Sequence, residues 1–177
     1  MKQILILLSL VFLFPFCLSA EEQALQAYSP QVTFSIGSRF GTTKGKFKKV
    51  RVENFQAAQG QAKIVIETKS IDTDNSSRDD HLRNEDFFDC KKYPTAVFLL
   101  QSLQKEKSYY NASGTLTLHG KTKKVSFRVR KTGKPEDTAG VYKGNFSLDR
   151  TEYGISYNSF INPIDKMVQM TVSLVVK

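Results

Sequence analysis

The chain has 177 residues, of which 26 are basic and 17 acidic, so its net charge is +9. This length is ordinary for one domain and allows a core that needs no disulfide or metal to hold it. A positive charge of this size can attract anionic lipids, diphosphates or nucleic acid. Because the N-terminus predicts export from the cytoplasm, no nucleic-acid partner is expected.

The first 20 residues are typical of a secretory signal peptide. Lys2 precedes an apolar stretch over residues 4–16, and Ala20 supplies a small residue at the expected cleavage point. An uncleaved membrane anchor is the alternative, which Pro15 disfavours because proline breaks helices. We expect cleavage after Ala20 and a periplasmic or secreted protein.

The mature chain is predicted to comprise a flexible segment, residues 21–30, and one domain, residues 31–177. Cys90 would be its only cysteine. An internal disulfide is therefore excluded, and the domain must be held by its core alone.

Period-two alternation of apolar and polar residues dominates the chain after residue 30, as in Val32, Phe34 and Ile36. Such alternation predicts strands that are buried on one face. The eight predicted strands cover residues 31–36, 45–52, 61–67, 95–103, 112–118, 124–130, 141–150 and 168–176. Strands of this length, bounded by turn residues, indicate an antiparallel sandwich or barrel.

The polar face of these strands carries charges, among them Lys63, Glu67, Arg128 and Arg130. Charges facing lipid would be costly, so a porin-like membrane barrel is disfavoured and the apolar face must point inward. An eight-stranded barrel has an interior that is either filled by side chains or just wide enough for one small ligand.

Residues 76–89 show no alternation. Ser77 and Asp80 match a helix capping box, which predicts a short helix over Asp79–Arg83. Such a helix would lay Leu82, Phe87 and Phe88 on an open barrel mouth. Because few apolar residues anchor this segment and its acidic residues, Asp79 included, should stay in water, we expect it to act as a lid.

The inward positions predict the wall of a tunnel, although alternation by itself reports only burial. Small members of the set should leave volume that a thin, flexible chain could occupy. The predicted wall residues are Phe34, Ile36, Ile64, Ile66, Phe98, Leu100, Ala112, Gly114, Leu116, Leu118, Phe127, Phe146, Val172 and Leu174.

Several longer motifs are specific when taken together in order and spacing. They include Arg78-Asp79-Asp80-His81-Leu82-Arg83, Asp86-Phe87-Phe88-Asp89, Lys92-Tyr93-Pro94-Thr95, Gly114-Thr115-Leu116-Thr117-Leu118-His119-Gly120 and Asp149-Arg150-Thr151-Glu152-Tyr153-Gly154. In these motifs the chain resembles the YceI-like family of exported polyisoprenoid-binding proteins, from Val32 to Lys177.

The resemblance implies an all-β fold with a short helical cover, an extended lipocalin-like antiparallel eight-stranded barrel. It also implies a tunnel for an isoprenoid quinone, an isoprenyl phosphate or a fatty amide, without enzymatic activity or a cofactor. Arg78, Arg83 and Arg150 lie in family-like segments next to the predicted mouth and become the headgroup candidates. Lys121, Lys124 and Leu100 depart from the family pattern, so the ligand cannot be copied from relatives.

The basic clusters near residues 44–51 and 121–131 fit a solvated outer face, with docking to an anionic membrane as the alternative. His81 and His119 are far apart in the sequence, and no metal site is expected. Two further functions stay open: an enzyme acting on an isoprenoid lipid, for which His81 with Asp79 and Asp80 is the only visible acid–base group, and a surface protein with a filled barrel. The oligomeric state is not predicted.

Overall fold

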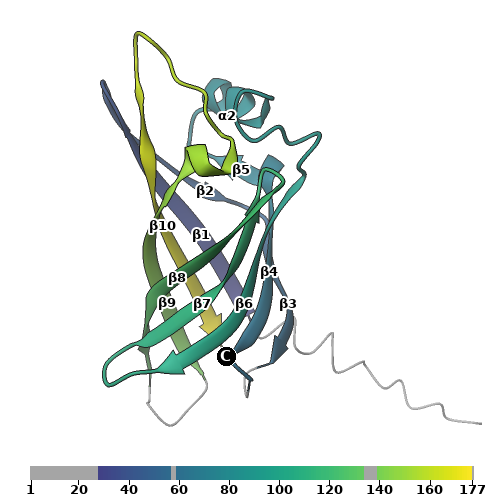
Figure 1. Cartoon of the computed structure of the whole chain (residues 1–177), viewed down its shortest axis with the longest axis vertical. Coiled ribbons are helices and arrows are strands. Elements are labelled where there is room, and N and C mark those ends of the chain that lie inside the picture. Colours follow the sequence, from purple (N-terminus) through teal and green to yellow (C-terminus); the bar gives the residue numbers. More distant parts are fainter. Residues whose placement is uncertain (1–27, 57–58, 134–138, 177) are drawn as a thin grey trace, which may run out of the picture.

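The computed structural model describes residues 28–56, 59–133 and 139–176. The predicted signal peptide and its cleavage point lie outside these residues. Within them one strongly curled antiparallel sheet forms the wall of a barrel (Figure 1). Its strands are β1 Tyr28–Ser38, β2 Gly41–Phe47, β3 Val50–Gln56, β4 Gln61–Glu67, β5 Ile71–Asp72, β6 Thr95–Lys105, β7 Tyr110–Leu118, β8 Lys121–Thr132, β9 Gly140–Asp149 and β10 Ile164–Val176.

The strands follow the order β3-β4-β6-β7-β8-β9-β10-β1-β2-β5, in which each strand is hydrogen-bonded to its neighbours. The N-terminal strand β1 pairs along its length with the C-terminal strand β10, so both ends of the domain lie in the middle of the sheet. The edge strand β3 curls round to contact β1. The predicted all-β fold with inward apolar residues is therefore confirmed.

The predicted second strand, residues 45–52, is instead divided into β2 and β3. The chain leaves the ladder at Lys48 and Lys49, whose backbone amides donate to the carbonyl and hydroxyl oxygens of Ser70 at 3.0 Å each. The short β5 adds a further strand beside β2. The sheet consequently has ten strands rather than the predicted eight.

The prediction of a flexible segment over residues 21–30 is wrong for residues 28–30. β1 begins at Tyr28, which pairs with Val176 at the end of β10. Backbone pairing with the last strand fixes residues that alternation alone did not mark, because the pattern becomes clear only from Val32 onward.

The helical cover is α2, Ser76–Arg83, which lies across one end of the barrel (Figure 1). It starts earlier than predicted, because the side chain of Asn75 caps it by accepting the Arg78 amide at 2.9 Å. Asp79 is only 5% exposed, so the expectation that it stays in water is wrong. Its carboxylate accepts the amide and hydroxyl of Thr73, at 2.9 and 2.6 Å, and ties α2 to the loop before it.

Candidate functional site

A cavity of about 400 Å³ occupies the end of the barrel opposite α2, and we call it the barrel cavity. Residues at strand ends, such as Pro30, Tyr110, Tyr142 and Val176, place it there. Its size falls within the range of small-molecule sites. The predicted wall residues that line it are Ile64, Phe98, Leu100, Ala112, Phe127, Val172 and Leu174.

A second cavity of about 380 Å³ lies beneath α2, and we call it the helix-side cavity. Phe34 and Ile36 of β1 form one wall of it. The predicted mouth residues Leu82, Phe87 and Phe88 line it from the α2 segment. None of these three lines the barrel cavity, so the α2 end covers the helix-side cavity and not the barrel cavity.

The two cavities share no lining residue, so a tunnel that joins them stays a prediction. A core cluster lies between them and contributes Phe87 and Ile155 to one wall and Val32 to the other. The remaining predicted wall residues apart from Gly114 belong to this core or pack against it, namely Ile66, Leu116, Leu118 and Phe146. Alternation placed them correctly inside the barrel but could not show that they pack against other side chains.

The assignment of Gly114 to the wall stays a prediction, since Gly114 is buried but lines neither cavity. A Cβ atom on Gly114 would overlap the backbone carbonyl oxygen of Leu99 on the neighbouring strand. The pairing of β6 and β7 shifts register between Leu100 and Ser102, and this irregularity brings the two backbones close at Gly114. Glycine is therefore needed at this position for the backbone approach.

The small side chains of two alanines leave space for the barrel cavity. Ala62 of β4 and Ala112 of β7 are buried and line it. Phe127 on the adjacent strand β8 is the cross-strand partner of Ala112. Its ring lies close to the backbone of Gly144 on β9, where a Cβ atom would come within 2.7 Å of the ring. The small residues Ala62, Ala112 and Gly144 therefore line an apolar space that larger side chains would fill.

Two of the three headgroup candidates hold the backbone in place. Arg150 is 5% exposed, and its guanidinium donates to the carbonyls of Ile155, Tyr157, Ile164 and Asp165 at 2.7 to 3.1 Å. Burial lowers the pKa of the Arg150 guanidinium. Although Arg150 reaches the helix-side cavity, these bonds occupy nearly all of its donors.

Arg83 lines neither cavity. It donates to the carbonyls of Lys69 and Ile71 at 3.0 and 2.9 Å and to Asp80 at 2.7 Å, and so holds α2 against the preceding segment. Arg78 does line the helix-side cavity, and its two bonds both go to Thr73, through Nε and Nη2. Since a guanidinium has five donors, Arg78 keeps donors available for an anion.

His81 also lines the helix-side cavity, where its Nε2 lies 3.2 Å from Asp86 and its ring packs edge-on against Phe87 and Tyr157. His119 lies elsewhere, with Nδ1 3.2 Å from the Tyr153 carbonyl. In the part of the chain that the structure describes, no three His, Cys, Asp or Glu side chains gather as a metal site would require.

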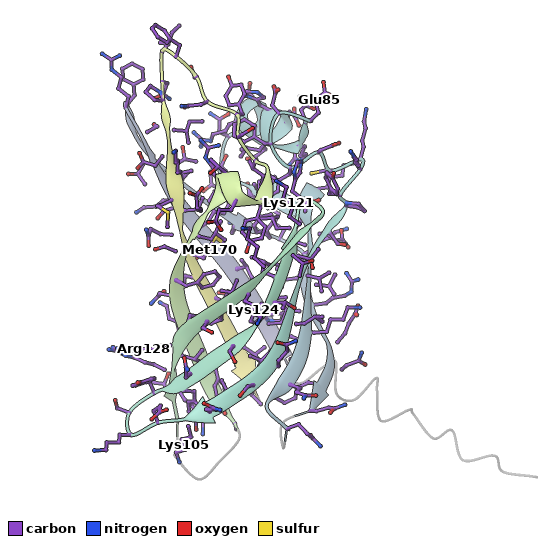
Figure 2. All side chains as sticks on the ribbon, viewed as in Figure 1. Glu85, Lys105, Lys121, Lys124, Arg128 and Met170 are labelled. Carbon is purple, nitrogen blue, oxygen red and sulfur yellow. The ribbon has the colours of Figure 1, made fainter. Side chains whose placement is uncertain are left out.

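Sequence reasoning missed several lining residues of the barrel cavity, including Val52, Tyr110, Val129 and Tyr142. Val129 continues the parity of Phe127 on β8, so alternation could have found it. Of the basic clusters, Lys124 and Arg128 lie on the outside of the barrel, as Figure 2 shows. Lys46 and Lys48 pair with Asp72 at 3.5 and 3.1 Å.

Fold and cavities together define an antiparallel β-barrel with apolar internal space of ligand size. The YceI-like domain model matches residues 24–177, and the chain belongs to this family. Among the curated relatives, a UPF0312 protein of Photorhabdus laumondii is 34% identical over 60% of this chain and 56% of its own length. A UPF0312 protein of Pseudomonas aeruginosa is 31% identical over 64% and 61%. The chain thus spans about three fifths of these two relatives.

Solved structures share the fold. Burkholderia cenocepacia BcnA has a TM-score of 0.74 at 24% identity, covering 84% of this chain and 96% of its own. A Campylobacter jejuni YCEI protein has a TM-score of 0.59 at 25% identity, covering 71% and 83%. A polyisoprenoid binding domain from Saccharophagus degradans has a TM-score of 0.62 at 15% identity, covering 85% and 99%. Among the described residues of this chain, no helix has the length and apolar character to cross a membrane.

Proposed function

We propose that the protein binds a long apolar lipid inside its barrel without chemically changing it. The barrel cavity carries this proposal, because apolar side chains surround about 400 Å³ of space that small residues leave unfilled. Each buried methylene contributes about 0.8 kcal/mol, so a hydrocarbon chain there would gain affinity without polar contacts. A polyisoprenoid is the favoured class, and a structural relative is a polyisoprenoid binding domain.

The polar end of the lipid is proposed to lie by Arg78. Of the three candidate arginines it alone combines a position on a cavity with uncommitted donors. A guanidinium binds phosphate through two parallel hydrogen bonds, which suits an isoprenyl phosphate. A lipid that reaches from Arg78 into the barrel cavity must displace side chains of the intervening core.

The proposed location is the periplasm or the outside of the cell, which rests on the signal-like N-terminus. Catalysis is not proposed, because His81 is paired with Asp86 and its ring contacts Phe87 and Tyr157, none of which is a nucleophile. If the protein converted an isoprenoid, and His81→Ala lost this activity while it still bound lipid, the result would instead show that the protein is an enzyme.

Native mass spectrometry of the purified protein tests the proposal, followed by organic extraction of the same sample. We expect a population heavier than the polypeptide by the mass of one lipid, and an extract that contains this lipid. A single species at the polypeptide mass, which also fails to take up added polyprenol, would favour the filled barrel instead.

A further inference from the structure

Three large apolar side chains are exposed to solvent at the α2 end of the barrel. Phe160 is 99% exposed, Ile161 73% and Phe40 70%. Phe40 lies in the turn between β1 and β2, and the other two lie in the segment between Gly154 and β10. Both segments extend beyond the barrel wall at this end (Figure 1). We call residues 38–41 and 158–163 the apolar tip.

Hydrogen bonds join the two segments of the apolar tip. The Arg39 amide donates to the Pro163 carbonyl at 3.2 Å, and the Phe40 amide donates to Asn162 Oδ1 at 3.4 Å. The Asn162 amide in turn donates to Ser159 Oγ at 3.1 Å. The exposed side chains therefore project from a connected backbone unit, so presenting them together requires little further ordering.

The apolar tip itself is positive, because Arg39 is the one charged residue within residues 38–41 and 158–163. No Asp or Glu occurs between residues 23 and 52 or between residues 153 and 164. The Arg39 guanidinium lies 5.6 Å from the centroid of the Phe40 ring. The nearest acidic residue in the chain after the tip is Asp165, beside Gly37, and Lys166 follows it. Aromatic and aliphatic side chains with a cation among them are typical of surfaces that enter a lipid interface.

We infer that the apolar tip inserts into the surface of an anionic lipid bilayer, with Arg39 at the level of the phosphates. Association with a second copy is the poorer explanation, because three side chains on a projection supply far less than the roughly 1,200 Å² of a specific interface. Ser38, Ser159 and Asn162 of the tip also line the helix-side cavity, so insertion would turn that cavity toward the bilayer. This inference goes beyond lipid binding in the barrel, because an empty barrel would dock equally well.

The absence of tryptophan from the chain allows a direct test. Phe160→Trp places a single indole on the apolar tip, and Val141→Trp places one at an exposed position on the opposite end of the barrel. With vesicles of equal parts phosphatidylglycerol and phosphatidylcholine, we expect blue-shifted, quencher-protected emission from the first variant and unchanged emission from the second. Unchanged emission from both variants would overturn the inference. A blue shift of Phe160→Trp that grows with protein concentration in the absence of vesicles would also overturn it, because it would indicate self-association.

Vesicle flotation gives a second readout. Phe160→Ser combined with Ile161→Ser should reduce the fraction bound to these vesicles at least about tenfold, since burial of both side chains is lost. Arg39→Gln should reduce binding about fivefold, and only to anionic vesicles. Val141→Ser, the matched control, should bind as the unchanged protein does. Equal binding by the double variant and the control would contradict insertion.

Discussion

The rings of Phe127 and Phe146 are stacked at an interplanar angle of 18°, with their centroids 4.6 Å apart. Phe127 lines the barrel cavity, whereas Phe146 packs against the core that separates this cavity from the helix-side cavity. Phe98 extends the row, with its centroid 5.7 Å from that of Phe127. Aromatic contacts therefore connect the wall of the barrel cavity to the core.

Phe146→Ala should lengthen the barrel cavity toward α2. The lost ring leaves volume next to Phe127, and stability should fall by less than the 3 to 5 kcal/mol of a fully buried phenylalanine, because Phe146 is half-buried. Competition among polyprenols of increasing length should show a shift toward longer chains. Phe55→Ala is the comparison, since Phe55 also lines the cavity but lies near its outer end. An unchanged length preference in Phe146→Ala would show that the cavity does not grow inward.

Gly114→Ala should destabilise the fold by about 1 to 3 kcal/mol, the usual cost of overpacking. The added methyl group would meet the Leu99 carbonyl and push β7 away from β6. Thermal unfolding checks this, with Thr115→Ala on the same strand as the control. A Gly114→Ala variant as stable as this control would show that the two backbones are not held together there.

Arg150 and Arg78 should respond differently to the same substitution. Arg150→Gln removes hydrogen bonds from a buried cation to four carbonyls, and we expect a loss of about 3 kcal/mol or more. Arg78→Gln at an exposed position should change stability by less than about 1 kcal/mol and weaken binding of a polyprenyl phosphate more than of the corresponding alcohol. Denaturant unfolding and paired binding titrations measure both effects. Equal losses for phosphate and alcohol would remove Arg78 from the headgroup site.

Asp149 should make stability depend on pH in the acid range. Its carboxylate accepts the Thr151 hydroxyl at 2.6 Å and the Thr151 amide at 2.8 Å, and these bonds lower the pKa of Asp149 below its ordinary value. A carboxyl group with a lowered folded-state pKa stabilises the protein above its unfolded-state pKa, and this contribution is lost as the pH falls through the folded-state value.

Asp149→Asn should therefore lower the melting temperature at neutral pH, and its difference from the unchanged protein should shrink below about pH 4. Glu53 and Asp72 also have lowered pKa values, so both proteins should still lose stability in acid. A difference that stays constant from neutral to acid pH would show that the charge of Asp149 is not involved.

Alternation predicted the strands and the inward face well, because burial on one side of a strand leaves a period of two in the sequence. It could not predict depth along the barrel. Phe34 and Phe98 have the same inward orientation but line different cavities. It also could not reveal that Arg150 binds carbonyls between residues 155 and 165, since these contacts depend on how the loop that follows Arg150 folds back to β10. The backbone approach at Gly114 likewise arises from a register shift that no local pattern records.

The central claim is that lipid occupies the barrel cavity, and Ala112→Leu tests it most directly. Ala112 is 2% exposed and lines the cavity, so the added atoms must enter the space proposed for lipid. Its control is Ser126→Leu, at an exposed position on the adjacent strand β8. Bound lipid per folded protein, measured by native mass spectrometry, should fall severalfold in Ala112→Leu and stay unchanged in Ser126→Leu. Full lipid occupancy in a folded Ala112→Leu variant would contradict the claim.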